Sequence, residues 1–460
     1  MADDRNNEKR DDERDDPAVG LVGSVSAALE RNALDEAATL VSGLRARDLA
    51  EVIEMLQPDQ RVALIQAMGA AFDYEVLSEI DEGVRDQLSE ALPNELLAKA
   101  VTQLDSDDAA YLIENLEDSD KEEILAQLDS GDREALERNL DYPEETAGRI
   151  MQSDFVAVPP FWTVGHVIDH MRDAAEQLPE HFSEIFVVDP SYRVLGSVDL
   201  SRLLRTKRDA RVSAIMDAER HLVLATADQE EVARQFERYD LMSAPVVDQY
   251  NRLVGVVTVD DVVEVIQDEA EEDMKALAGV GDESLADSVL ETVRSRVPWL
   301  IVNLGTAILA SFVIQAFDAT IEQMVALAVL MPMVASIGGN AGTQTMTVTV
   351  RALATNKLSK VNTPRVISRE AFVGLVNGIV LSSIMAVVVF IWFGSGKLGG
   401  VIAAAMICNC LAAGLGGILV PLIMDRFGLD PAPASGVFVT MITDVVGFFA
   451  FLGLASIWLL

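Results

Sequence analysis

Residues 436–460 read GVFVTMITDVVGFFAFLGLASIWLL, an apolar stretch long enough to cross a lipid bilayer as a helix. It carries one acid, Asp444, with Thr443 beside it and Thr440 one turn earlier. A carboxylate at the centre of a membrane span costs about 2.5–3.5 kcal/mol on insertion scales, so an acid there usually serves a function. Carboxylate, hydroxyl and backbone carbonyl oxygens are ligands for hard cations such as Mg²⁺, Ca²⁺ and Mn²⁺. The stretch therefore predicts a membrane helix that binds a divalent cation.

Four more apolar stretches precede it, over residues 299–317, 324–350, 371–393 and 401–424. Each meets the length of about 20 residues that a spanning helix needs. The predicted inner flanks hold eight of the nine Lys and Arg after residue 290, and the outer loops hold only Lys397. Because basic residues favour the cytoplasmic side, we predict five helices across the inner cell membrane, a cytoplasmic N-terminal half and a C-terminus outside.

The second stretch contains MPMVASIGGNAGTQTMTVTV, residues 331–350, which combines Gly and Pro with amide and hydroxyl side chains. Small residues let helices approach closely, and amides form hydrogen bonds between helices. Gly and Pro also interrupt helices, so that backbone carbonyl groups line a water-filled path. The sequence leaves both interpretations open, tight helix packing and a cation path.

Charge divides the 460 residues into two parts. Before residue 290 lie 67 acids and 26 bases, whereas the rest of the chain holds seven acids and nine bases. The acidity excludes nucleic acid as a partner, because binding it needs clustered positive charge. It suits cations; the alternative is solubility or adaptation to salt. The two cysteines, Cys408 and Cys410, lie in an apolar stretch, so no disulfide framework is expected.

The acidic part has three kinds of pattern. Residues 1–19 predict a charged disordered tail without the apolar core of a signal peptide. Residues 20–140 repeat units such as RDLAEVIEML and DDAAYLIENL, which predict an all-α superhelical N-domain. Residues 141–206 and 207–270 each hold two β-rich runs, a turn and a helix, which predict a tandem α/β repeat.

The second repeat ends in DDVVEVIQDEAEED, residues 260–273, which holds eight acids and no base. Like charges one turn apart destabilise a helix. We therefore expect Mg²⁺ or another divalent cation to neutralise this stretch; the alternative is a solvated acidic helix. A connecting helix over residues 271–296 is expected to lead into an α-helical membrane domain, residues 297–460.

Several motifs in this order resemble the MgtE family of magnesium transporters and channels: YPEETAG (142–148), GGNAGTQ (338–344), VRALAT (350–355), and DPAPASG followed by TDVVG (430–447). The resemblance extends from about residue 20 to the C-terminus, and the tandem repeat resembles cystathionine-β-synthase (CBS) domains. It implies a homodimer in the lipid bilayer that conducts Mg²⁺ along its axis, between the second and fifth helices. The pore residues that it implies are Asp444, Thr440, Thr443, Gly338, Gly339 and Asn340.

The resemblance also implies that cytosolic Mg²⁺ closes the pore by binding between acids of the N-domain, the CBS repeats and the connecting helix. The corresponding acids are Glu79, Asp105, Asp107, Asp108, Asp260, Asp261, Glu264, Asp268, Glu271 and Glu272. From the residues alone, Asp107 and Asp108 are equally explained as helix caps.

Adenine nucleotide is a further candidate ligand. Thr258 and Asp261 match a pattern by which CBS domains hold ribose, but the first repeat has Arg202 in place of that Asp. We therefore expect at most one ATP site per subunit, or none.

Two other functions stay open. One is transport of a broader range of divalent cations (Mn²⁺, Co²⁺ or Ca²⁺) or cation exchange, and the other is ligand sensing by a membrane receptor with CBS domains. An isolated acid such as Asp444 disfavours a receptor, which does not need a charge inside the membrane. No P-loop, HExxH or GxSxG motif occurs, so no enzyme is expected. The leading hypothesis is Mg²⁺ uptake that cytosolic Mg²⁺ shuts off.

Overall fold

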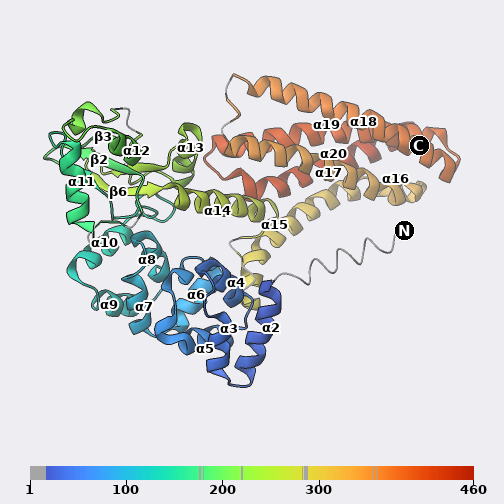
Figure 1. Cartoon of the computed structure of the whole chain (residues 1–460). Coiled ribbons are helices and arrows are strands. Elements are labelled where there is room, and N and C mark those ends of the chain that lie inside the picture. The colour runs from blue at the N-terminus through green and yellow to red at the C-terminus, as the bar shows by residue number, and fades with distance from the viewer. Residues whose placement is uncertain are drawn as a thin grey trace, which may run out of the picture. The chain divides into compact units, whose positions relative to one another are not determined.

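The computed structural model describes residues 17–459 except 176–177, 180, 219–220, 282, 284–287, 356 and 360. The chain forms two compact units, Met1–Glu269 and Ala270–Leu460 (Figure 1). The tail expected over residues 1–19 lies outside the described residues up to residue 16, and the first helix begins at Pro17.

The first unit begins with short helices joined by tight turns, which agrees with the predicted all-α N-domain. They are α2 (Pro17–Glu30), α3 (Leu34–Val41), α4 (Ala46–Glu54), α5 (Pro58–Met68), η1 (Gly69–Ala71), η2 (Tyr74–Leu77), α6 (Glu82–Ala91), α7 (Asn94–Val101), α8 (Ser106–Ile113), α9 (Asp118–Leu125) and α10 (Ser130–Leu140). Asp81 and Asp129 cap α6 and α10 by accepting hydrogen bonds from backbone N–H groups of the first turn. Leu64, Leu97 and Ile113 are fully buried between the helices.

Two small α/β repeats follow. The first contains β1 (Ala157–Val158), α11 (Val164–Asp173), β2 (Glu184–Val188), β3 (Val194–Asp199), α12 (Leu200–Arg205) and η4 (Val212–Ala214). The second contains β4 (Val223–Leu224), α13 (Gln229–Tyr239), β5 (Ser243–Val247), β6 (Leu253–Thr258) and α14 (Val259–Leu277). In both sheets the first strand runs parallel and the third antiparallel to the central strand, which confirms the tandem repeat (Figure 1).

The two hairpins turn in the same way. Asp189 and Asp248 each accept hydrogen bonds from the backbone N–H groups two and four residues later. Each turn then passes through a residue with positive φ, Tyr192 at 63° and Asn251 at 59°. The carboxylate thus fixes the turn that a bulky residue such as Tyr192 would otherwise disfavour.

The second unit is helical and contains α15 (Val289–Ala316), α16 (Asp318–Gln323), α17 (Ala326–Ala354), α18 (Thr363–Phe393), α19 (Gly396–Arg426) and α20 (Pro431–Trp458). Among the described residues, five helices are long and apolar enough to cross a membrane, all except α16 in this group. This result confirms the predicted number of spans. The most buried of the five is α19, which packs against α17, α18 and α20 (Figure 1).

Glycines on α18 and α19 allow the two helices to touch. A Cβ atom on Gly374 would clash with the Cys410 carbonyl, and one on Gly414 would lie 2.7 Å from the Glu370 carbonyl oxygen. In a lipid bilayer the hydrophobic effect does not drive helices together. Close contact between backbones instead stabilises the pair through van der Waals interactions.

For α17 the sequence left two interpretations open, and for residues 271–296 it predicted one connecting helix. The helix α17 runs without interruption from Ala326 to Ala354, although it contains Pro332 and Gly338. Gly338 and Gly342 serve close packing, Gly339 has open space around it, and none of the three breaks the helix to expose carbonyl groups. The connecting segment over residues 271–296 is not one helix either: α14 continues from the second repeat to Leu277, and α15 begins at Val289 behind a capping box formed by Ser288 and Glu291.

Candidate cation sites

The predicted pore acid lies in the middle of α20. The Asp444 side chain is half-buried and has no ion-pair partner among the residues that the structure describes. Thr443 is fully buried, and its Oγ1 donates to the Thr440 carbonyl at 2.9 Å; Thr440 Oγ1 donates to the Gly436 carbonyl at 2.9 Å. Both hydroxyl protons point to backbone, so the remaining lone pairs of the hydroxyl oxygens are free to accept from water or to face a cation.

The residues of the motif on α17 divide between the inside and the outside of the unit. Gly338 is buried against Asn409 of α19, whereas Gly339 is half-buried and Asn340 is exposed. Gly342, which was not among the predicted pore residues, is buried against Val439 and Thr443 of α20. The structure thus shows that glycines of this motif pack α17 closely against α19 and α20.

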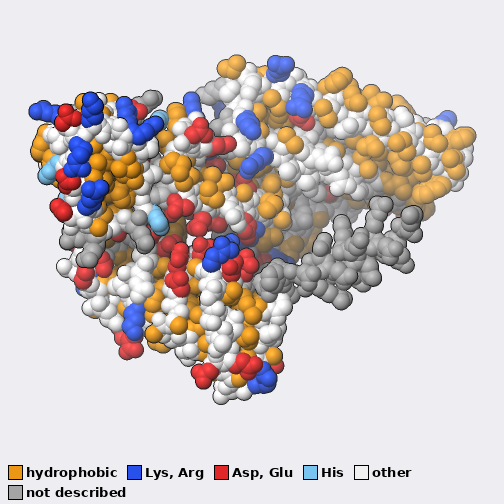
Figure 2. Space-filling view, in the orientation of Figure 1, with side chains coloured by type: hydrophobic (Ala, Val, Ile, Leu, Met, Phe, Trp, Pro, Cys, Tyr) orange, Lys and Arg blue, Asp and Glu red, His pale blue; other side chains and the backbone are white. Residues whose placement is uncertain are grey.

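A second group of predicted residues gathers at the start of α8. Asp105 makes no side-chain capping hydrogen bond, so capping does not explain it. Asp107 is only 4% exposed, and its Oδ1 has no hydrogen-bond partner among the described residues. Burial raises the pKa of Asp107 well above its usual range, and the charges of Asp261, Asp108 and Asp105 raise it further. Figure 2 shows several acidic side chains together on the visible face of the first unit.

The acids of α8 face those at the start of α14. Burial, followed by the charges of Glu264 and Asp261, raises the pKa of Asp108 to about 7. Burial likewise raises the pKa of Asp261 to about 7, although hydrogen bonds from Thr258 lower it. Thr258 Oγ1 donates to Asp261 Oδ2 at 2.6 Å. Carboxylates that share a partly buried site without enough positive charge favour a proton or a cation between them.

Few bases lie near this acid cluster, which we define as Asp105, Asp107, Asp108, Asp260, Asp261 and Glu264. Arg85 of α6 lies over the Tyr111 ring at 5.4 Å, and its charge lowers the pKa of Asp108 and of Glu264. Arg47 Nη1 lies 2.9 Å from Glu79 Oε2. The negative charge of Glu79 raises the pKa of Glu264. Glu79 therefore lies at the edge of the cluster and already has a partner.

The cluster is not a closed ligand shell. Among the described residues, no group of three or more His, Cys, Asp or Glu side chains is arranged to hold a metal ion. Asp268 lies two turns from Asp261 on α14, and its charge also raises the pKa of Glu264. Glu271 and Glu272 belong to the second unit, where Glu271 forms an ion pair with Lys275 at 2.9 Å.

One of the two candidate nucleotide residues, Thr258, lines a narrow pocket, whereas Asp261 does not. Thr258 borders a space of about 30 Å³, together with Asp154, His181, Ser183 and Glu184. That volume is close to the share of one water molecule in the liquid, whereas ligand pockets measure about 300 Å³ or more. Two acids in the lining also repel phosphate groups. In this conformation the pocket does not accommodate a nucleotide.

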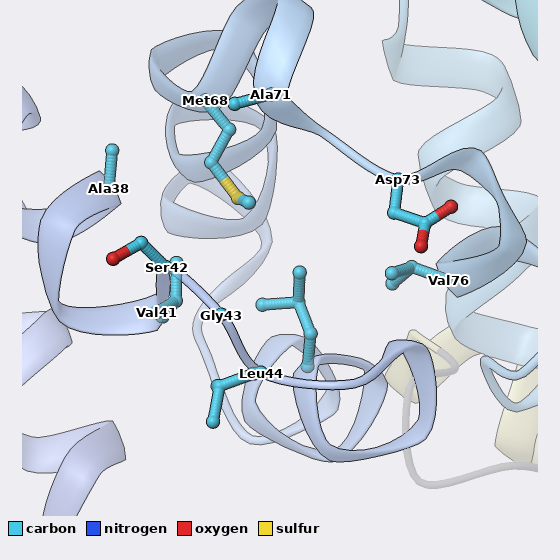
Figure 3. A pocket seen from close by; sticks show the side chains of 10 residues that line it. Ala38, Val41, Ser42, Gly43, Leu44, Met68, Ala71, Asp73 and Val76 are labelled. Carbon is cyan, nitrogen blue, oxygen red and sulfur yellow. The ribbon is translucent and has the colours of Figure 1, made fainter.

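One further pocket, of about 180 Å³, lies between the first helices of the N-domain. Figure 3 shows Val41, Leu44, Met68 and Val76 around it, and Asp73 at its edge. Asp73 is the one titratable residue of the lining, and its carboxylate caps η2 by accepting from the Glu75 N–H. This pocket offers no set of charged ligands for a cation.

Sequence comparisons find relatives over nearly the whole chain. Residues 331–454 match the MgtE family model, a divalent cation transporter; residues 44–145 match the MgtE intracellular N domain; residues 147–209 and 212–268 match the CBS domain. The chain is similar to the magnesium transporter MgtE of Bacillus subtilis strain 168, with 32% identity over 424 residues that cover 89% of this chain and 94% of that one. It is 35% identical to the magnesium transporter MgtE of Enterococcus faecalis over 320 residues, 70% of each chain.

A solved structure aligns with about half of the chain. It is the cytosolic domain of the Mg²⁺ channel MgtE in complex with ATP, which covers 53% of this chain and 99% of its own length at 30% identity and a TM-score of 0.48.

Proposed function

This chain belongs to the MgtE family, and we propose that it is a Mg²⁺-selective channel or transporter for magnesium uptake that closes when cytosolic Mg²⁺ binds its acidic domains. Its relatives are transporters, not enzymes. The observation that carries the transport proposal is Asp444, an acid without an ion-pair partner among the described residues in the middle of a helix long enough to span the membrane. An acid in that place attracts cations and repels anions.

We place the conduction path between α17 and α20 of a homodimer, so that two Asp444 side chains face one axis. Mg²⁺ gives up its water reluctantly, and the paired carboxylates would therefore hold a hydrated ion through its water shell. Such outer-sphere binding also lets the ion leave again, which conduction requires. Thr440 and Thr443 supply hydroxyl oxygens on the same helix, and Gly338, Gly339 and Asn340 belong to the facing motif.

Gating rests on the acid cluster. Asp107 is buried and Asp108 and Asp261 are partly buried, and their mutual repulsion makes the compact arrangement of α8 and α14 unfavourable without a cation, as their raised pKa values indicate. Mg²⁺ between these acids would stabilise the compact state and not a state in which they separate. A ligand shifts an equilibrium only through such a difference in affinity.

The other end of α14 supplies the link to the membrane helices. Its last residues, Ala276 and Leu277, pack within the second unit against Met346 and Val350 of α17 and against Ala432 and Val439 of α20. Because Asp260 and Asp261 lie in the first turn of α14, we propose that this one helix connects the acid cluster to both helices of the proposed path. We propose that Mg²⁺ binding at its start holds its end against the path.

The proposed domain limits follow from this arrangement. We assign residues 20–140 to the N-domain, 141–206 and 207–270 to the CBS repeats, 271–296 to the connection and 297–460 to the membrane domain. We also propose that the protein lies in the inner cell membrane with its N-terminal domains in the cytoplasm and its C-terminus outside, because the basic residues flank the spans on one side.

Ion flux into liposomes tests the proposal. Purified protein is reconstituted, and Mg²⁺ entry is followed with an internal dye while Mg²⁺ is varied separately on the two sides. We expect entry that Ca²⁺ and Na⁺ do not replace, and that falls when Mg²⁺ rises in the millimolar range on the side of the soluble domains. Equal entry of Mg²⁺, Mn²⁺ and Ca²⁺ would instead indicate a broader divalent transporter, and no entry at all would refute transport.

A further inference from the structure

An asparagine side chain lies in the apolar centre of the second unit. Asn409 of α19 is 1% exposed, and its Nδ2 donates to the Val334 carbonyl of α17 at 2.8 Å. Its Oδ1 has no hydrogen-bond partner within the described part of the chain. Burying an amide that is only half satisfied among apolar side chains destabilises a fold. A residue at this place therefore needs a reason other than a gain in stability.

Two glycines make the room for this amide, one on each helix of the proposed path. A Cβ atom on Gly338 of α17 would overlap the Asn409 side chain, and a Cβ atom on Gly447 of α20 would lie 2.7 Å from Asn409 Nδ2. Real Cβ atoms do not approach another heavy atom so closely, so either substitution would displace the amide. The three helices meet around Asn409, and its amide fills the space between them.

The contact lies beside the proposed filter. Gly338 is the first residue of the GGNAGTQ motif, and Val334 lies one turn before it on α17. Gly447 follows Asp444 by three residues on α20, so it lies on the neighbouring turn. The Asn409 amide thus contacts α17 at the motif and α20 next to the pore acid at the same time.

We propose that Asn409 is a positioning residue that fixes the separation of α17 and α20 at the level of Asp444 and thereby sets which hydrated divalent cations pass. The inference rests on the proposed function, because it concerns the same path. Mg²⁺ holds its water shell in a rigid octahedron, whereas Ca²⁺ accepts more ligands at longer and more variable distances. A path matched to hydrated Mg²⁺ is therefore sensitive to a small change in helix separation, and selectivity responds before conduction is lost.

The test compares Mg²⁺ with Ca²⁺ entry for full-length variants in liposomes. Asn409→Leu keeps the number and branching of the side-chain heavy atoms but removes the hydrogen bond to Val334. Cys410→Ala is the matched control, because Cys410 is buried on the same helix but faces Gly374 and Gly378 of α18. We expect Asn409→Leu to insert and to lower the ratio of Mg²⁺ to Ca²⁺ entry about threefold, the factor that corresponds to one interhelical hydrogen bond. Cys410→Ala should keep the wild-type ratio.

A second set of variants serves if Asn409→Leu does not fold. Gly447→Ala alone should change the ratio, because its methyl group displaces the amide. In the double variant Asn409→Ala/Gly447→Ala that methyl group has space, so the double variant should differ little from Asn409→Ala alone.

An unchanged ratio in the folded Asn409→Leu protein, or additive effects in the double variant, would overturn the inference while leaving the proposed function intact. A wild-type protein that passes no Mg²⁺ would instead refute the proposed function itself. Size-exclusion profiles and membrane yield identify the folded variants, and only folded variants are compared, so that loss of both fluxes through unfolding is not counted as an unchanged ratio.

Discussion

Nη1 of Arg351, at the end of α17, lies 4.0 Å from Oδ2 of Asp273, near the end of α14. Burial raises the pKa of Asp273, and the Arg351 charge lowers it again. The pair therefore attracts the end of α14 to the second membrane helix, next to the contact of Leu277 with Met346 and Val350. Because the Arg351 side chain is largely exposed, the attraction is modest, about 1 kcal/mol or less.

Reversal of that ion pair tests whether α14 controls the path. Asp273→Arg should weaken closure, because two positive charges then repel, and Mg²⁺ entry should persist at several-fold higher internal Mg²⁺ than in the wild type. The double variant Asp273→Arg/Arg351→Asp restores opposite charges and should close near the wild-type concentration. Flux measured against internal Mg²⁺ gives both midpoints. Equal midpoints for Asp273→Arg and the wild type would show that this contact has no part in gating.

Asp444→Asn tests the pore assignment. The variant keeps the shape of the side chain but removes the charge that attracts the ion. At the separations of an outer-sphere contact and an effective dielectric constant near 20, we expect Mg²⁺ entry to fall on the order of 100-fold or more. Size-exclusion profiles and membrane yield should stay normal, since a neutral amide enters a span more easily than an acid. Wild-type flux from this variant would contradict the assignment.

A buried ion pair between the N-domain and the first repeat predicts a dependence of stability on pH. Arg149 Nε lies 3.5 Å from Glu114 Oε2, and both side chains are less than one tenth exposed. Burial nevertheless raises the pKa of Glu114 to about 7, although the charges of Arg149 and Arg85 lower it. A folded-state pKa above the ordinary 4.5 means that the stabilisation is complete below about pH 4.5 and is lost as the pH rises through 7.

The matching variant is Glu114→Gln, which resembles the protonated form. Between pH 5 and pH 8.5 the wild type should lose on the order of 2 kcal/mol more unfolding free energy than Glu114→Gln does. Thermal unfolding of the full-length protein at a series of pH values measures the difference between the two slopes. Parallel curves would mean that Glu114 is already ionised in the folded protein at pH 5.

The sequence predicted the elements whose signal is local. Five spans follow from hydropathy, and the paired repeats follow from the copied pattern of strands, turn and helix. It did not predict that α17 stays continuous through Pro332, because neighbouring helices decide whether a membrane helix tolerates proline. It also did not predict that α14 ends at Leu277, although Gly279, which has a φ of 72°, and Gly281 follow and glycines at such positions commonly end a helix.

The acid cluster and the Asn409 contact likewise could be predicted from the sequence only in part. Composition reveals many acids but not which of them become buried, so in the sequence Asp107 does not differ from Asp105, which is exposed, or from Asp108, which is half-buried. Asn409 belongs to no recognisable sequence motif. Its proposed role depends on its contacts with Gly338 and Gly447, which are distant in the chain and come together only in the folded bundle. A single asparagine in an apolar stretch is the one sequence signal for such a contact.

Nucleotide binding offers a test of the second repeat. Thr258 and Asp261 match the ribose pattern, but Thr258 Oγ1 is engaged with Asp261, and the adjoining pocket has a volume of about 30 Å³. We expect calorimetry with ATP to show at most one site per chain, and Asp261→Asn to remove any heat that appears. Arg202→Asp in the first repeat restores the missing acid and is the control for the pattern itself. Two tight sites per wild-type chain would refute the expectation.

The acid cluster makes the strongest prediction about regulation, since its members repel one another until a cation binds. Neutralising Asp107, Asp108 and Asp261 to Ala should leave the path open at high Mg²⁺ and should not destroy conduction, because these residues are far from Asp444 in the chain and belong to the other unit. Protease cleavage between α14 and α15 during a Mg²⁺ titration measures closure without any flux. In the wild type, Mg²⁺ should protect this segment more than Na⁺ of equal ionic strength does; the triple variant should not be protected.

A variant that should strengthen Mg²⁺ binding distinguishes specific binding at the acid cluster from an effect of overall charge. Arg85 is a positive charge beside the cluster, and it lowers the pKa of Asp108 and Glu264. Arg85→Gln makes the cluster more negative, so Mg²⁺ should bind more tightly and protection should appear at a several-fold lower concentration. Arg133→Gln is the control, because Arg133 pairs with Glu137 on the exposed face of α10 and adds the same change of net charge elsewhere. If Arg85→Gln and Arg133→Gln shift the midpoint equally, or if Na⁺ protects as well as Mg²⁺, the acids act only through overall charge and Mg²⁺ does not bridge α8 and α14.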